Sequence, residues 1–226
     1  MAESSGTLMT VAVIGGTGKE GSGLALRWAR AGYRVIIGSR DAARAAEKAE
    51  ELNETLGSPA IHGMDNPDAA RAADLVVLSV PYQAHEPILM SIRDAVQGKI
   101  LVDVTVPLQP PAIRTVHIPE GKAAVLEAQA LLGPDVRVVA AFQNISHTHL
   151  KELDAPVDSD VLVASDDDEA KLEVAHLVEA IPGMRAIDIG PLANAVAVEA
   201  LTPVILYINK RYKAPGAGIR ITGLDL

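Results

Sequence analysis

The stretch that decides the fold is Val11-Ala12-Val13-Ile14-Gly15-Gly16-Thr17-Gly18-Lys19-Glu20-Gly21. Its apolar first part predicts a buried strand, and Gly16, Gly18 and Gly21 have the spacing Gly-x-Gly-x-x-Gly at the expected start of a helix. These glycines permit a tight turn, let backbone approach a diphosphate and let the helix pack against the sheet. The free N–H groups at such a helix start favour an anion. The motif therefore predicts a dinucleotide site, with an unliganded tight turn as the less favoured alternative.

Outward from this motif, short β-branched runs alternate with Ala-rich helical stretches, which is typical of βαβ units and a parallel sheet. Further strands are expected at residues 34–38, 60–62, 75–80, 100–104 and 136–142, and beyond residue 150 at residues 161–164 and 186–189. A long helix is expected over residues 193–207. We predict an α/β fold in which residues 1–150 form a Rossmann-type doubly wound parallel sheet and residues 151–226 form a small C-terminal α/β domain.

The composition excludes several classes of protein. Among 226 residues, 49% are apolar and 22% charged, which excludes a wholly disordered chain. The net charge of −9 and the 3% of aromatic residues argue against nucleic acid as a partner. No cysteine is present, so thiolate chemistry and disulfides are excluded. The polar start and the interruption of residues 195–208 by Glu199 and Pro203 predict a cytoplasmic protein without a membrane segment.

The residues after the second expected strand indicate which dinucleotide binds. An NAD-binding domain usually has an acidic residue there, whereas this chain has Ser39-Arg40, with Arg44 one helical turn further on. A hydroxyl and two guanidinium groups suit a 2′-phosphate, which an acid would repel. We therefore predict NADP as the cofactor. The alternative is a solvated helix start with arginines that bind nothing.

Several segments together resemble the NADPH:F420 oxidoreductases, the F420-dependent NADP reductases. These segments are Gly15-Gly16-Thr17-Gly18, Gly38-Ser39-Arg40, Ser79-Val80-Pro81, and Gly190-Pro191-Leu192 with Leu201-Thr202-Pro203. The last pair is the more specific part, and the resemblance covers nearly the whole chain. It implies an oxidoreductase that transfers a hydride reversibly between NADPH and the deazaflavin coenzyme F420. We also expect a homodimer.

The resemblance implies roles for particular residues. The family's nucleotide contacts correspond to Thr17, Gly18, Lys19, Glu20, Ser39, Arg40 and Arg44, with Val80, Tyr82 and Val106 near the nicotinamide. Its deazaflavin site corresponds to Gln143, Asn144, Ile145 and Thr202. Ile145 matches an isoleucine that packs between the reacting rings, and no acid or base is implied. The chain departs from the family pattern at Gln143, where a histidine occurs, and at Val196, where an arginine occurs.

Two other clusters of charged or titratable residues are candidates for a function. His147 and His149 would share a face if their segment were a strand, but they lack a third ligand at motif spacing, so we predict no metal site. A place on the surface or at the rim of the pocket is favoured instead. The basic residues Lys210, Arg211, Lys213 and Arg220 near the end are either a solvated tail or an attraction for the anionic tail of the deazaflavin.

Two alternatives to the predicted function remain open. One is an NADP-dependent reductase of another small substrate, such as an imine or a ketone. The other is an NADP-binding redox sensor without turnover.

Overall fold

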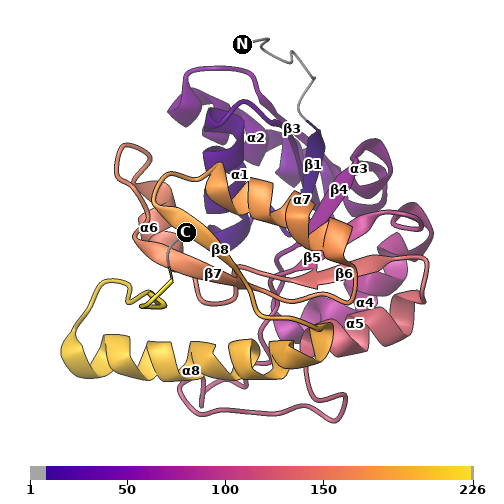
Figure 1. Ribbon diagram of the computed structural model, residues 1–226. Helices are drawn as coiled ribbons and strands as arrows, with labels where there is room; N and C mark the ends of the chain where they lie inside the picture. The colour runs from indigo at the N-terminus through magenta and orange to yellow at the C-terminus, as the bar shows by residue number, and fades with distance from the viewer. Residues whose placement is uncertain (1–8, 225–226) are drawn as a thin grey trace, which may run out of the picture.

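The first six strands form one parallel sheet in the computed structural model, which describes residues 9–224 (Figure 1). The spatial order is β3-β2-β1-β4-β5-β6. The strands are β1 (Thr10–Ile14), β2 (Arg34–Ser39), β3 (Ile61–Asp65), β4 (Leu75–Leu78), β5 (Ile100–Asp103) and β6 (Arg137–Ala140). The order reverses between β1 and β4, and a doubly wound sheet binds its ligand at such a switch point. The predicted Rossmann-type fold is confirmed.

Helices cover both faces of this sheet because its strands are apolar on both sides. Val11 and Val13 of β1 belong to the core formed with α1 and α2, whereas Ala12 and Ile14 belong to the core formed with α3, α4 and α5. The helices are α1 (Lys19–Arg30), α2 (Ala42–Leu56), α3 (Asn66–Ala72), α4 (Tyr82–Ile92) with the short η1 (Arg93–Ala95), and α5 (Ala124–Leu132).

The second half of the chain adds a two-stranded parallel sheet, three α-helices and a short 3-10 helix. Its elements are α6 (His147–Lys151), β7 (Ser159–Val163), α7 (Asp168–Glu179), β8 (Met184–Asp188), η2 (Leu192–Asn194) and α8 (Ala195–Tyr212). An antiparallel bridge between Ala140 and Ala164 links the end of β6 to the residue after β7. One buried cluster contains residues from both halves, such as Val13 and Val161. A domain boundary near residue 150 stays a prediction.

Helix α8 differs from its expected form because it is longer. It continues to Tyr212, so that Lys210 and Arg211 lie on a helix rather than in a tail (Figure 1). Together η2 and α8 run over Leu192–Tyr212, 21 residues that are long and apolar enough to cross a membrane. The apolar helical stretch is therefore longer than residues 195–208, the range considered from the sequence. Its middle nevertheless packs against the protein, with Val198, Glu199 and Pro203 buried.

The Arg27 side chain of α1 is a buried connection between the two halves. Gly23, one turn earlier, lies so close to Leu150 that a Cβ there would be 2.7 Å from the Leu150 Cβ. In the space this leaves, the Arg27 guanidinium donates hydrogen bonds to five backbone carbonyls just before β7. The acceptors are His149 (2.6 Å), Leu150 (3.0 Å), Glu152 (2.7 Å), Leu153 (3.4 Å) and Ala155 (2.9 Å). One side chain therefore holds α6 and the following turn against the first βα unit.

Replacing Arg27 by Met should reduce the free energy of unfolding by at least about 3 kcal/mol. The aliphatic part is kept, but several carbonyls lose their donor, each at a cost of about 1–3 kcal/mol where it stays buried. Arg30→Met is the matched control, because Arg30 pairs with Asp154 on the surface and should contribute less than about 1 kcal/mol. Urea denaturation measures both variants. Equal losses in both would contradict the role assigned to Arg27.

Candidate functional site

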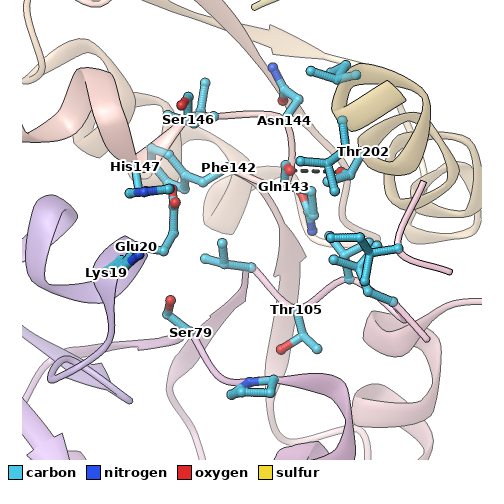
Figure 2. Close-up of a pocket in the computed structure, with 18 of the residues that line it drawn as sticks. Lys19, Glu20, Ser79, Thr105, Phe142, Gln143, Asn144, Ser146, His147 and Thr202 are labelled. Carbon is cyan, nitrogen blue, oxygen red and sulfur yellow. Dashed lines mark hydrogen bonds between the residues drawn. The ribbon is translucent and has the colours of Figure 1, made fainter. Parts of the chain in front are cut away.

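A cavity of about 600 Å³ lies at the carboxyl edge of the sheet (Figure 2). Four connections that follow β1, β4, β5 and β6 line it, and α8 and the segment after it form the remaining wall. The carboxyl ends of parallel strands meet at one edge, so residues far apart in sequence converge there. The residues predicted from the sequence that line it are Gly18, Lys19, Glu20, Val80, Tyr82, Val106, Gln143, Asn144, Ile145 and Thr202.

The loop between β1 and α1 can hold an anion. Helix α1 begins at Lys19, so the amides of Lys19, Glu20 and Gly21 have no partner within the helix. Gly15 has a φ of +80°, and a Cβ there would lie 2.2 Å from the Ser79 carbonyl oxygen, so only glycine fits this turn. Gly16 and Thr17 shape the turn without lining the cavity. The geometry is that of a helix N-terminus open to a phosphate.

The predicted 2′-phosphate residues lie at the same sheet edge, one strand further out. Gly38 at the end of β2 pairs with Ile14 of β1, and its carbonyl accepts the Gly15 amide at 3.1 Å. Ser39 is buried and its Oγ accepts the Asp41 amide at 3.3 Å, whereas Arg40 and Arg44 are exposed. Asp41 caps α2 and accepts from the Arg44 amide. None of these residues lines the main cavity, and the arginines extend into solvent beside it.

Three residues predicted for the nicotinamide end line the middle of the cavity. Val80 follows β4, Tyr82 begins α4, and Val106 lies in the connection that follows β5. The Tyr82 hydroxyl donates to Glu127 Oε2 at 2.9 Å. Burial and this carboxylate raise the pKa of Tyr82 to about 12, so the hydroxyl stays neutral. This part of the cavity offers mainly apolar surface.

The loop after β6 presents the predicted deazaflavin residues. It begins at Phe142, whose φ of +71° is left-handed and rare for a side chain of this size. Thr202 on α8 donates to the Gln143 carbonyl at 2.8 Å (Figure 2), and Gln143 Nε2 donates to the Asp103 carbonyl at 2.7 Å. Asn144 Nδ2 donates to the Asp160 carbonyl at 2.8 Å. The loop is thus held from α8, β5 and β7.

Two acceptors in this loop are left free. Gln143 Oε1 and Asn144 Oδ1 are buried without a hydrogen-bond partner among the described residues. A buried acceptor of this kind costs free energy unless a ligand or water supplies a donor. Ile145, which follows them, is 8% exposed and lines the cavity. Gln143, Asn144 and Ile145 thus contribute to one wall of the cavity, and two of them carry a buried acceptor without a partner.

The two histidines lie on a helix and not on a strand. Ser146 caps α6, its Oγ accepting the Thr148 amide at 3.4 Å, and this local capping favours a helical turn. His147 lines the cavity, whereas His149 Nε2 bonds the Gly216 carbonyl at 2.6 Å. No group of three or more metal-ligating side chains occurs within residues 9–224.

One of the four basic residues near the end of the chain, Arg220, forms ion pairs. Arg220 pairs with Asp158 and Asp160, and its Nη1 lies 2.7 Å from Asp160 Oδ1. Arg185 also pairs with Asp160. The hydrogen bonds from Arg185 and Arg220 hold the pKa of the Asp160 carboxyl well below its usual range. Arg220 therefore secures the final segment against β7 and β8. Arg220 is exposed but ion-paired, whereas Lys210, Arg211 and Lys213 lie exposed at the end of α8 and directly after it.

A buried polar group behind the cavity was missed in the sequence. His85 Nε2 lies 2.7 Å from Asp103 Oδ2, and both side chains are buried. Glu199 of α8 accepts the first amides of α5, from Ala124 at 2.7 Å and from Val125 at 3.1 Å. Burial lowers the pKa of His85, but the carboxylates of Asp103 and its neighbours outweigh this, and the net shift is upward. These contacts fasten α8 and α5 to the sheet.

Comparisons with known proteins identify the family to which the sequence is similar. Residues 10–107 match the family model described as "NADP oxidoreductase coenzyme F420-dependent". The chain is 48% identical over 223 residues to an F420-dependent NADP reductase from Methanothermobacter thermautotrophicus, covering 96% of each chain. It is 42% identical to another from Methanocaldococcus jannaschii, covering 96% of this chain and all of the other.

The chain belongs to the family of F420-dependent NADP reductases. A crystal structure described as a candidate F420-dependent NADP reductase from Arthrobacter sp. FB24 has a TM-score of 0.80 and 27% identity. It covers 95% of this chain and 100% of its own. The resemblance seen in the sequence is therefore confirmed.

The structure shows what surrounds Gln143 and Val196, the two residues that depart from the family pattern. Gln143 is buried and bonded to the backbone of β5, and Val196 is partly buried against the core cluster that includes Ile14. Further lining residues come from the connection that follows β5, from α8 and from the segment after it, where no motif marked them. These are Thr105, Leu108, Pro110, Ile113, Asn209, Pro215 and Ala217. The signal available was only their position after a strand end or after α8.

Replacing Glu199 by Ala should reduce the free energy of unfolding by about 2–5 kcal/mol, because two buried amides lose their acceptor. Glu199→Gln keeps one acceptor and should lose less. Burial raises the folded-state pKa of Glu199 from 4.5 to about 8. The folded state therefore holds a proton that the unfolded state releases, and its stability falls as pH rises from about 4.5 to 8. Thermal unfolding from pH 5 to 9 should show a smaller fall for Glu199→Gln. An equal fall in both proteins would refute the assignment.

Proposed function

We propose that this protein transfers a hydride reversibly between NADPH and coenzyme F420. The observation that supports this best is the single cavity that joins the helix N-terminus of α1 to the loop after β6. The first part suits a diphosphate, and the loop after β6 contributes Gln143, Asn144 and Ile145 to the same cavity. The curated relatives are named F420-dependent NADP reductases.

The experiment mixes the protein with NADPH and oxidised F420 and follows the loss of visible absorbance of the deazaflavin. Flavin mononucleotide replaces F420 in one control, and an imine or a ketone replaces it in another. Rapid bleaching with F420 alone supports the proposal. Turnover only with the imine or ketone, or tight NADPH binding without any turnover, would contradict it and favour one of the alternative functions.

Bound NADPH and F420 supply the hydride donor and the hydride acceptor of the reaction. The protein contributes position and exclusion of water. We infer that the loop at Gly16, Thr17, Gly18 and Lys19 binds the diphosphate, and that Ser39, Arg40 and Arg44 bind the 2′-phosphate. Val80, Tyr82 and Val106 form the surface for the nicotinamide, while Gln143, Asn144, Ile145 and Thr202 form the surface for the deazaflavin. Alignment of two rings requires no acid or base from the protein.

We further propose that the protein is a cytoplasmic homodimer. One face of α8 exposes large apolar side chains at helical spacing, with Val204, Ile208 and Tyr212 four residues apart and Tyr207 beside them. Their exposed fractions run from 37% at Ile208 to 75% at Tyr212. A second copy would cover this face. Sedimentation equilibrium that gives only the monomer mass would contradict the dimer.

The cofactor preference should follow from Ser39. Ser39→Glu places a carboxylate where we infer the 2′-phosphate binds, so kcat/KM for NADPH should fall about a hundredfold or more, with a smaller effect on NADH. Ser58→Glu adds the same charge at an exposed position after α2 and serves as the control. Comparable kcat/KM values for NADPH and NADH in the native protein would refute the assigned preference.

The hydride step should depend on the packing of Ile145. Ile145→Ala should slow the step by up to about a hundredfold, because a misplacement of about 1 Å at the reacting centre costs that much. Stopped-flow absorbance with 4-deuterated NADPH isolates the step through its isotope effect. Ile118→Ala, at an exposed position outside the cavity lining, is the control. An unchanged rate in Ile145→Ala would show that this side chain does not position the rings.

A further inference from the structure

Asp103, the last residue of β5, is fully buried and bonds to three separate segments around the cavity. Its Oδ2 lies 2.7 Å from Nε2 of His85 on α4. Its Oδ1 accepts the backbone amide of Thr105, two residues further on, at 3.0 Å, and its backbone carbonyl accepts Nε2 of Gln143 at 2.7 Å. One residue therefore connects α4, the segment that follows β5 and the loop after β6.

The bond between the Asp103 side chain and the Thr105 amide closes an Asx turn, in which an aspartate accepts from the backbone two residues on. The turn bends the chain directly after β5, where Thr105 and Val106 line the cavity. The Thr105 side chain is itself buried, and its amide faces away from the sheet toward Oδ1. The shape of this part of the wall thus depends on one acceptor atom.

His85 holds the carboxylate in the orientation that the turn needs. The oxygens of a carboxylate only accept hydrogen bonds, so His85 donates its Nε2–H to Oδ2 and leaves Oδ1 for the Thr105 amide. Tyr82, one turn earlier on α4, lines the cavity, and its ring centroid lies 6.2 Å from that of His85. The pair therefore also links Asp103 to the helix that carries Tyr82.

The loop after β6 depends on the same residue. The Gln143 side chain has no further hydrogen bond among residues 9–224, because its Oε1 is unpaired. Figure 2 shows Thr105 and Gln143 at the cavity, on the connections that follow β5 and β6. Asp103 and His85 do not line the cavity themselves.

We propose that the pair of His85 and Asp103 positions the two inner surfaces of the cavity relative to each other. It acts through Thr105 and Val106 on one side and through Gln143 on the other. Both members of the pair are positioning residues, and neither exchanges a proton with a ring. The inference rests on the proposed hydride transfer, because the surfaces that it aligns are those assigned to the nicotinamide and the deazaflavin.

Asp103→Ala removes the acceptor of the turn and the partner of His85. The rate of the hydride step should fall at least about tenfold, since a misplacement of about 1 Å costs about a hundredfold. Stopped-flow absorbance with NADPH and 4-deuterated NADPH measures this rate. The Kd of NADPH, measured by nicotinamide fluorescence, should change less than about threefold, because the interactions lost act on alignment rather than on binding.

Asp103→Asn is the conservative variant. It keeps Oδ1 for the Thr105 amide, and its Nδ2 donates to His85 Nε2 in the other tautomer of the imidazole. Its hydride rate should stay within about threefold of the native rate. A fall of tenfold or more in Asp103→Asn would give the role to the charge itself and overturn the proposal, even where Asp103→Ala does not fold.

Asn53→Ala is the matched control for a loss of stability alone. Asn53 on α2 exchanges two hydrogen bonds with the Ile61 backbone, at 2.8 and 2.9 Å, and lies outside the cavity lining. This variant should unfold more easily but keep the native hydride rate. A rate in Asp103→Ala no lower than that in Asn53→Ala overturns the positioning role and leaves hydride transfer between NADPH and F420 intact.

A second measurement needs neither coenzyme. Amide hydrogen exchange, followed by NMR in the free protein, should be at least about tenfold faster at Thr105 in Asp103→Ala than in the native protein, whereas Val102 within β5 changes less. Asp103→Asn should keep the slow exchange at Thr105. Equal acceleration at Thr105 and Val102 would show general loosening and overturn the proposal. Native protein that does not reduce F420 with NADPH would overturn the proposed function and this inference together.

Discussion

The hydrogen bonds of Arg27 are the constraint on which the rest of the structure depends. The guanidinium lies on the helix that begins with the glycine loop, and its acceptors lie directly after the loop that carries Gln143, Asn144 and Ile145. The two surfaces of the cavity therefore belong to one bonded unit, although more than a hundred residues of sequence separate them. Transfer between two bound rings needs their separation held to a fraction of an ångström.

The same requirement explains the strained start of the loop after β6. The backbone of Phe142 has a left-handed φ, which costs about 1–3 kcal/mol where a side chain is present. Its ring packs edge-on against Trp28 at 5.6 Å between centroids, and Thr202 holds the next carbonyl. Packing thus maintains a conformation that the local sequence does not favour. The residues that follow are directed into the cavity as a result.

The parallel sheet and part of the cavity lining could be predicted because they depend on local patterns. Apolar runs and glycine spacing identify βα units, and parallel strands bring their carboxyl ends together. The length of α8, the helical turn at His147, the pairing of Arg220 with Asp160 and the burial of Glu199 could not be predicted. The pairing of Arg220 and the burial of Glu199 depend on contacts between segments distant in sequence, for which a single sequence carries no periodic signal. The turn at His147 depends on the local cap by Ser146, which the spacing of the two histidines does not indicate.

The chain contains a single tryptophan, Trp28, and its position has a spectroscopic consequence. The indole is fully buried, donates to the Leu177 carbonyl of α7 at 2.9 Å and meets the Phe142 ring edge-on. It thus lies between the helix of the glycine loop, the α7 layer and the first residue of the loop after β6. Its emission reports the docking of these three segments without an introduced label. The fluorescence of Trp28 during equilibrium unfolding therefore reports on the packing of the site as well as on the fold.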